Sequence, residues 1–315
     1  MTKASVDCFC PAKINLHLAV GRADANGMHP IVSTMASLTF GDQLSISCDE
    51  SESESAASAL SQRIVRRCAD DAPRKIQIDW PVEQDLIARA WRGVETHVGR
   101  RLPVRITLHK RIPTGAGLGG GSANAAAVIH GLDDLFRLSL DATDHRQLAA
   151  ELGSDVHFAL GVGRGETAAL VTGLGEKLRP LALPPRRVLL LLPDFGCATA
   201  PVYRAFDQLG LGREPAELAS LAKLLRCGAE TEPAFNDLES AACRAEPRLT
   251  NFLAAARQRL RLPVHVTGSG STCYVLPANE AELAEAVAQT RGWEEAVAVA
   301  AGLRSSSPIT ENAVD

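Results

Sequence analysis

Apolar and polar residues alternate along several short segments of the chain, which is the pattern of strands that bury one face. The alternation is clearest in residues 36–48 and 102–113. Short apolar runs of strand length predict further strands over residues 6–20, 74–80, 166–171 and 188–192, and a hairpin-like pair within residues 262–277. We therefore expect strands in both halves of the chain.

Other segments carry apolar residues every three to four positions, which is the period of an amphipathic helix. Residues 49–61 are acidic and serine-rich, and we expect the whole of residues 49–75 to form a solvated loop. Helices mixed with alternating strands favour an α+β fold with antiparallel pairing over a doubly wound parallel sheet. Helices are predicted over residues 84–98, 122–136, 145–153, 200–209, 216–225, 236–244, 249–261 and 279–292.

Composition narrows the classes of function. The chain has 315 residues, 46% hydrophobic and 22% charged, which is typical of a soluble globular protein of about two domains. Lys and Arg number 33 against 37 for Asp and Glu, so a nucleic-acid partner is not expected. No apolar run approaches the ~20 residues of a membrane span, and no signal peptide is apparent, so we expect no membrane partner and a cytoplasmic location. The eight cysteines form no CxxC pair or zinc-type cluster, and no surface stripe predicts an oligomeric state.

Five glycines lie within seven residues between a predicted strand and a predicted helix, in residues 113–122, here called the glycine loop. Glycines let the backbone approach a ligand closely, and amides at a helix N-terminus bind phosphate oxygens. The hydroxyl of Ser122 is placed to reach a phosphate or a bound Mg²⁺. The loop lacks the lysine of a Walker A motif and the third glycine of a dinucleotide fingerprint. We interpret it as a phosphate-binding loop of another kind, with a flexible connection as the alternative.

The sequence motif Pro-x3-Gly-Leu-Gly-x-x-Ser-Ala, which begins at Pro113, resembles the phosphate loop of the GHMP small-molecule kinases. Further motifs narrow the resemblance to the 4-diphosphocytidyl-2-C-methyl-D-erythritol kinase branch, and they follow the order of that family from residue 11 to residue 276. They are Pro11-Ala-Lys-Ile-Asn-Leu, Lys110-Arg-Ile-Pro, Leu152-Gly-Ser-Asp-Val, Gly173-x-Gly-Glu-Lys-Leu, Phe235-Asn-Asp-Leu-Glu and Thr267-Gly-Ser-Gly.

The resemblance implies a two-lobed α+β fold. An N-terminal ATP-binding lobe similar to ribosomal protein S5 domain 2 is expected over residues 1–180, and a ferredoxin-like substrate lobe over residues 181–315. The implied activity is phosphorylation of the C2 hydroxyl of 4-diphosphocytidyl-2-C-methyl-D-erythritol, using ATP and Mg²⁺, in non-mevalonate isoprenoid synthesis. The alternatives are a sister kinase acting on another small alcohol, such as homoserine or mevalonate, and a non-catalytic nucleotide-binding relative.

The resemblance also implies roles for single residues. It places Lys13 beside the reacting hydroxyl, where its charge stabilises the transferring phosphoryl group, and makes Asp155 the acceptor of the hydroxyl proton. From the residues alone, a solvated lysine and a helix-capping aspartate are the alternatives. The implied ATP-binding residues are Pro113, Gly115, Gly117, Leu118, Gly119, Gly120, Gly121 and Ser122, with Ser122 also on Mg²⁺. The implied substrate-binding residues are Asn15, Met28, His29, Tyr203, Thr267, Gly268 and Gly270.

One segment departs from the pattern of that branch. Its members typically carry Asp-Gly-Tyr-His where this chain has Asn26-Gly-Met-His, so Met28 replaces an aromatic ring and His29 is kept. A thioether forfeits base stacking worth about 1–3 kcal/mol. Tyr203 matches a position where the family often has an aromatic side chain, so we expect it to stack on the base, with a core tyrosine as the alternative.

Overall fold

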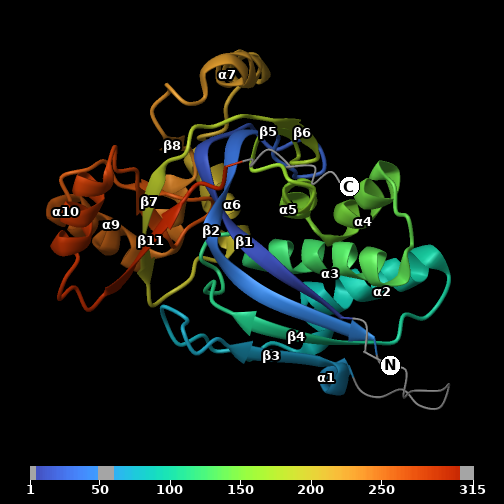
Figure 1. The fold of residues 1–315 in the computed structure, drawn as a ribbon. Helices are drawn as coiled ribbons and strands as arrows, with labels where there is room; N and C mark the ends of the chain where they lie inside the picture. The colour runs from blue at the N-terminus through green and yellow to red at the C-terminus, as the bar shows by residue number, and fades with distance from the viewer. Residues whose placement is uncertain (1–4, 49–59, 306–315) are drawn as a thin grey trace, which may run out of the picture.

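The computed structural model describes residues 5–48 and 60–305, which fold around two sheets (Figure 1). The seven-stranded sheet has the order β3-β4-β2-β1-β8, with β5 paired to β2 and β6 to β5. The four-stranded sheet has the order β11-β7-β10-β9. The first sheet contains β1 (Ser5–Val20), β2 (Ile31–Cys48), β3 (Ile64–Cys68), β4 (Val104–Lys110), β5 (Ala168–Gly173), β6 (Lys177–Pro180) and β8 (Phe235–Asn236). The second contains β7 (Arg187–Pro193), β9 (His265–Val266), β10 (Cys273–Val275) and β11 (Ala296–Gly302).

The long antiparallel pair β1 and β2 organises the first sheet. The start of β2 pairs with β5 and its end pairs with β4, so one strand holds two parts of the sheet together. The β1–β2 register shifts between Pro11 and Lys13 and again between Asn15 and His17. Proline cannot donate to the ladder, and bulges re-aim neighbouring side chains. The two irregularities therefore flank Lys13 and Asn15 and change the direction of their side chains.

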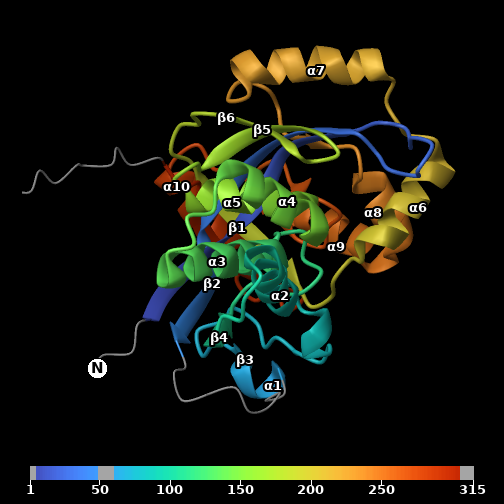
Figure 2. The same cartoon turned by 90° about the vertical axis from the view of Figure 1, so that its right-hand side faces the viewer.

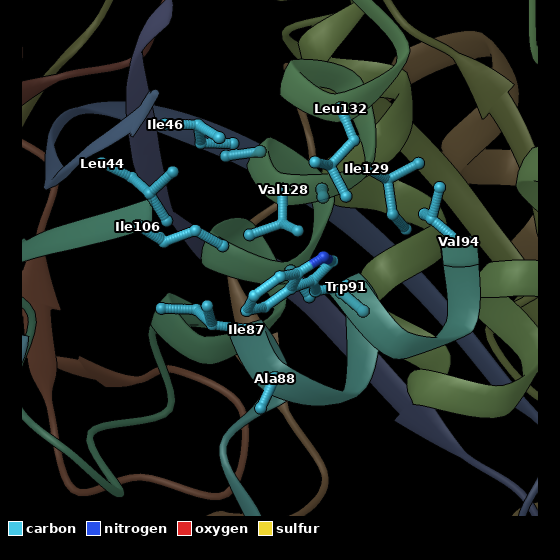
Figure 3. Close-up of a cluster of buried hydrophobic side chains, with 14 of the residues drawn as sticks. Leu44, Ile46, Ile87, Ala88, Trp91, Val94, Ile106, Val128, Ile129 and Leu132 are labelled. Carbon is cyan, nitrogen blue, oxygen red and sulfur yellow. The ribbon is translucent and has the colours of Figure 1, made fainter. Parts of the chain in front are cut away.

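Helices α2, α3, α4 and α5 cover one face of the first sheet (Figures 1 and 2). Figure 3 shows Trp91 and Ile87 of α2 packed with Val128 of α3 against Ile46 and Ile106 of the sheet. The indole N–H of Trp91 donates to the Leu102 carbonyl at 3.1 Å, so this large side chain is buried without an unpaired donor. The bounds are α1 (Leu60–Arg63), η1 (Val82–Gln84), α2 (Leu86–Val98), α3 (Gly120–Phe136), α4 (Ala142–Leu152) and α5 (Ser154–Gly163).

The remaining helices belong to the second half of the chain. Leu18 and Val20 of β1 join Leu189 and Leu191 of β7 and the apolar faces of α6, α8, α9 and α10 in one buried cluster. Because both sheets contribute to this cluster, the two sheets are packed together and not merely linked. Figure 2 shows α7 lying along the outside, over β5 and β6. The bounds are α6 (Thr199–Leu209), α7 (Pro215–Gly228), α8 (Glu239–Ala245), α9 (Pro247–Arg259) and α10 (Glu280–Gln289).

Three expectations about local structure need correction. Residues 74–80, predicted as a strand, have no regular structure, because β3 already occupies the edge of β4. Residues 60–68, expected to be loop, form α1 and β3; the part of the predicted loop at residues 49–59 lies outside the described residues. The helix predicted over residues 236–244 begins three residues later, since Asn236 pairs in β8. The α+β class and the mainly antiparallel pairing are confirmed.

The change from the first sheet to the second falls between Pro180 and Arg187. The division into lobes at residues 1–180 and 181–315 stays a prediction, and β8 of the second half pairs with β1 of the first. Within the described residues, no helix combines the length and the apolar character that a membrane span requires.

Candidate active site

A cavity of about 970 Å³ lies where the two halves of the chain meet. Its walls come from β1, the glycine loop, the first turns of α3 and α5, helix α6 and the turn before β10. Segments from both ends of the sequence therefore line one space, which is the usual arrangement of a small-molecule site.

The centre of the cavity contains a lysine, an amide and a carboxylate in contact. The Lys13 ammonium donates to Asn15 Oδ1 at 2.7 Å and lies 3.5 Å from Asp155 Oδ2. Lys13 is buried, and the Asp155 side chain keeps 37% of its surface exposed. The ammonium is thus held in place by Asn15 while the carboxylate of Asp155 remains open to a ligand in the cavity.

Backbone contacts fix the positions of Lys13 and Asn15. At the first bulge the Lys13 amide donates to the Leu118 carbonyl of the glycine loop at 2.9 Å. The Asn15 amide donates to Thr267 Oγ1 at 3.0 Å, and the Tyr274 hydroxyl donates to the Asn15 carbonyl at 2.9 Å. Since these partners come from the glycine loop and the second sheet, the site is assembled by tertiary contacts between distant segments.

The glycine loop leads directly into α3, which begins at Gly120 with Gly119 as its N-cap in the left-handed conformation. A helix N-terminus presents unpaired amides and a positive dipole end, which favours phosphate groups. A Cβ atom at Gly119 would lie 2.9 Å from Lys13 Cγ, and one at Gly117 would lie 2.9 Å from the Gly270 carbonyl and closer still to the Thr267 carbonyl. Bare backbone is therefore required for the loop to pack beside Lys13 and the 267–270 turn.

If the chain has the kinase activity expected from its sequence, Gly117→Ala should lower kcat/KM for ATP by about 100-fold, the loss that a displacement near 1 Å of a positioned group can cause. Gly117 has φ +74°, and its Cβ would press on two backbone carbonyls that cannot rotate away. Gly99→Ala is the matched control, because Gly99 has φ +66° with open space around it. Steady-state kinetics of both variants measure the effect, and equal losses would show that backbone strain alone is responsible.

The cavity lining also includes Met28, His29 and Tyr203, here called the base pocket after the role that the sequence predicts for them. The His29 and Tyr203 rings have centroids 4.9 Å apart at an interplanar angle of 47°. Burial, with a smaller contribution from the charge of Asp155, raises the pKa of Tyr203 to about 12, so its hydroxyl stays protonated at neutral pH. Met28 is 50% exposed.

The structure brings most of the sequence-predicted residues into the lining of this one cavity. Thr267 and Gly270 lie behind the lining, where they are buried: the Thr267 hydroxyl supports Asn15, and Gly270 packs on Gly117. The ligand contacts expected of these two residues stay predictions, as do the roles of the others. The residues in the lining are Lys13, Asn15, Met28, His29, Pro113, Gly115, Gly117, Leu118, Gly119, Gly120, Gly121, Ser122, Asp155, Tyr203 and Gly268.

Sequence reasoning missed a buried ion pair beneath the glycine loop. Lys110 Nζ lies 2.8 Å from Asp42 Oδ2, and the same carboxylate accepts hydrogen bonds from the amides of Arg111 and Ile112 and from Asn124 Nδ2. Lys110 and Asn124 also line the cavity. An aspartate in the middle of the strand predicted over residues 36–48 was the available signal, because a carboxylate buried in a sheet needs partners.

A second missed group lines the cavity beside the start of α2. The Trp80 indole N–H donates to Asp85 Oδ2 at 2.9 Å, and Arg66 Nη1 donates to the same oxygen at 3.0 Å. The Arg66 guanidinium lies over the Trp80 ring, 5.4 Å from its centroid. Nothing in the local sequence marked Trp80, because its partner Arg66 sits in a segment expected to be loop.

The fold and this cavity define a small-molecule kinase of the GHMP class. Residues 85–174 match the family model described as the GHMP kinases N terminal domain. A 4-diphosphocytidyl-2-C-methyl-D-erythritol kinase from Nocardia farcinica is 35% identical over 88% of this chain and 86% of its own. The namesake from Mycobacterium tuberculosis is 32% identical over 91% and 87%. The chain belongs to the 4-diphosphocytidyl-2-C-methyl-D-erythritol kinase family.

Solved structures agree with this placement. A crystal structure of 4-(cytidine 5'-diphospho)-2C-methyl-D-erythritol kinase matches with a TM-score of 0.68 and 31% identity, covering 95% of this chain and 99% of its own. A homoserine kinase from Cytophaga hutchinsonii matches at 0.60 with 15% identity over 97% and 96%, which shows the fold alone. The two-lobed α+β GHMP fold and the ATP-dependent kinase class expected from the sequence are thereby confirmed.

Proposed function

We propose that the protein transfers the terminal phosphoryl group of ATP to the C2 hydroxyl of 4-diphosphocytidyl-2-C-methyl-D-erythritol, a step of non-mevalonate isoprenoid synthesis. One observation carries the proposal: a single cavity contains the glycine loop, the Lys13–Asp155 pair and the base pocket. A donor phosphate, a reacting alcohol and a nucleotide base can therefore be accommodated in the same space. The relatives described above are named as kinases of this substrate.

Phosphoryl transfer depends mainly on positioning and on neutralising phosphate charge, because its transition state spreads charge over the phosphate oxygens. The amides of the glycine loop and the Lys13 ammonium supply that positive potential. Asp155 faces the cavity beside Lys13 and accepts the proton of the C2 hydroxyl. The hydroxyl oxygen bonds to the terminal phosphorus of ATP as the bond between that phosphorus and the ADP oxygen breaks, so ADP leaves. Asn15 Oδ1 accepts a hydrogen bond from this ammonium and so fixes its position beside Asp155.

We further propose that Mg²⁺ accompanies the ATP phosphates and is bound from the protein side by the Ser122 hydroxyl. Mg²⁺ prefers oxygen ligands and retains several waters beside phosphates. Ser122 lies in the first turn of α3 in the cavity lining and is an oxygen donor of the right kind. Within residues 5–48 and 60–305, no group of three or more His, Cys, Asp or Glu side chains forms a ready metal cage, which agrees with an ion held mainly by the nucleotide.

The base pocket is proposed to hold the cytosine of the substrate. Tyr203 presents an aromatic face from α6, and the imidazole of His29 supplies a hydrogen-bonding edge. Stacking on one ring is worth about 1–3 kcal/mol per base. Tyr203 is therefore proposed to be the one aromatic side chain that stacks on the base, where members of the family usually have two. Met28 would cover the other face of the base only loosely.

A second candidate substrate class follows from the same departure. Because Met28 is half-exposed at the position of a family aromatic residue, the pocket is open enough to suggest a sister kinase for another small alcohol. His29 and Tyr203 in mutual contact weigh against that alternative, since an acceptor without a base has no use for them.

ATP consumption with Mg²⁺ should be measured against the cytidyl-methylerythritol substrate, homoserine, mevalonate, phosphomevalonate and galactose. We expect turnover of the cytidyl substrate alone, competitive inhibition by CDP, and loss of turnover when EDTA removes the metal. Phosphorus NMR of the product should show a new phosphomonoester. Turnover of another alcohol alone would support the sister kinase, and ATP binding with no turnover would support the non-catalytic relative.

A further inference from the structure

The imidazole of His29 packs against one face of α6. Tyr203, Phe206 and Asp207 stand at i, i+3 and i+4 on this helix, so their side chains lie side by side. The His29 ring lies 4.9 Å from the Tyr203 ring and 5.9 Å from the Phe206 ring, the latter in an edge-on arrangement. Only 6% of the His29 side chain remains exposed. The ring is therefore confined between two aromatic neighbours.

Asp207 supplies the single polar contact of that ring among the described residues. His29 Nε2 lies 2.7 Å from Asp207 Oδ1. An ionised carboxylate only accepts hydrogen bonds, so Nε2 carries a proton and donates it. The other ring nitrogen, Nδ1, has no hydrogen-bond partner within residues 5–48 and 60–305, and the residue lines the cavity. Nδ1 is thus the nitrogen left for a ligand.

The helix that carries Asp207 is rigidly seated. Phe206 is 1% exposed and Val202 is fully buried, and both belong to the core cluster beneath α6. A positioning group is effective when its own support is rigid. The backbone that carries Asp207 is therefore held in place by packing that does not depend on the ligand, while the Asp207 side chain itself keeps 51% of its surface exposed.

We propose that Asp207 is a positioning residue for base recognition: it keeps the proton of His29 on Nε2, so that the lone pair of Nδ1 accepts a hydrogen bond from an exocyclic amino group. Cytosine presents such a donor and uracil presents a carbonyl oxygen at the same place. Asp207 therefore favours a 4-amino pyrimidine over a 4-oxo pyrimidine without touching the base itself. This inference rests on the proposed function.

Three variants test the proposal. Asp207→Ala removes the acceptor, Asp207→Asn keeps an amide oxygen that accepts from Nε2, and Gln208→Ala changes the exposed neighbour as a control. We expect Asp207→Ala to raise KM for the cytidyl substrate about tenfold, equivalent to about 1.4 kcal/mol, with kcat and KM for ATP unchanged. Asp207→Asn should restore most of the affinity, and Gln208→Ala should behave as wild type. A wild-type KM in Asp207→Ala would overturn the proposal.

Two further readouts separate this role from a merely structural one. Competition by CDP and by UDP should favour CDP in the wild type, and the preference should shrink in Asp207→Ala. Nitrogen-15 NMR of the His29 ring, assigned with His29→Gln, should show a protonated Nε2 and an unprotonated Nδ1, and a mixture of tautomers in Asp207→Ala. The proposal is refuted if the His29 ring is protonated on both nitrogens, or if the tautomer is the same in the wild type and in Asp207→Ala.

The outcomes also separate this inference from the proposed function. If the wild type turns over the cytidyl substrate and Asp207→Ala matches it, only the role of Asp207 fails. If the wild type rejects the cytidyl substrate, the proposed function fails. In that case the inference about Asp207 survives only if the wild type still binds CDP more tightly than UDP and the His29 ring is protonated on Nε2 alone. Any other result means that the inference fails as well.

Discussion

Asp155→Asn is expected to lower kcat by about 10²- to 10⁴-fold, the range that a positioned general base contributes. The amide keeps the size and polarity of the carboxylate but cannot take the proton of the attacking hydroxyl. The Asp155 carboxylate lies 3.5 Å from the Lys13 ammonium in the cavity lining, and the proposed function makes this carboxylate the acceptor of that proton. Steady-state and single-turnover kinetics at saturating ATP and cytidyl substrate measure the effect.

The control for this variant is Glu151→Gln on α4, an exposed carboxylate that does not line the cavity. Equilibrium ATP binding and thermal unfolding should be nearly unchanged in both proteins. Asp155 stabilises the fold through the dipole of α5 and through a partly exposed contact with Lys13, and both contributions are small. Asn15 still accepts a hydrogen bond from the Lys13 ammonium in the variant. A kcat within threefold of wild type in Asp155→Asn would contradict the base assignment and leave Lys13 and the glycine loop as the main contributors to catalysis.

Asp42→Ala is expected to lower the free energy of unfolding by about 3–5 kcal/mol, the cost of leaving a buried charge without its partner. Asp42 is fully buried and is the partner of the Lys110 ammonium, two backbone amides and Asn124. Removing the carboxylate leaves all of these donors unpaired in the core. Chemical denaturation followed by tryptophan fluorescence measures the loss.

Asp42→Asn separates the charge from the hydrogen bonds. It keeps one oxygen acceptor for the Arg111 and Ile112 amides, so we expect a smaller loss of stability than in Asp42→Ala. Asp70→Ala, at an exposed aspartate, should change stability by less than about 0.5 kcal/mol and serves as the control. A loss in Asp42→Ala no larger than that of the control would show that this buried network does not stabilise the fold.

Structural elements that depend on residues close together in the sequence were predicted correctly. The glycine loop and α3 follow from glycines and a helix-forming run that are contiguous in the sequence. The strand predicted over residues 74–80 was wrong because strand formation needs a free neighbouring edge, and β3 had taken that of β4. Helix α5 and strand β11 were not predicted, since a short apolar run does not by itself distinguish a buried helix from a buried strand.

The sequence by itself determined the α+β class, the glycine loop with the helix that follows it and, through its motifs, the kinase family, because these depend on local spacing and on the order of motifs. Only the tertiary structure decided which charges meet. Lys110 pairs with Asp42 across 68 positions, and His29 pairs with Asp207 across 178. No local period or spacing encodes such pairs, because the chain brings their partners together only when the two sheets and α6 pack around one cavity.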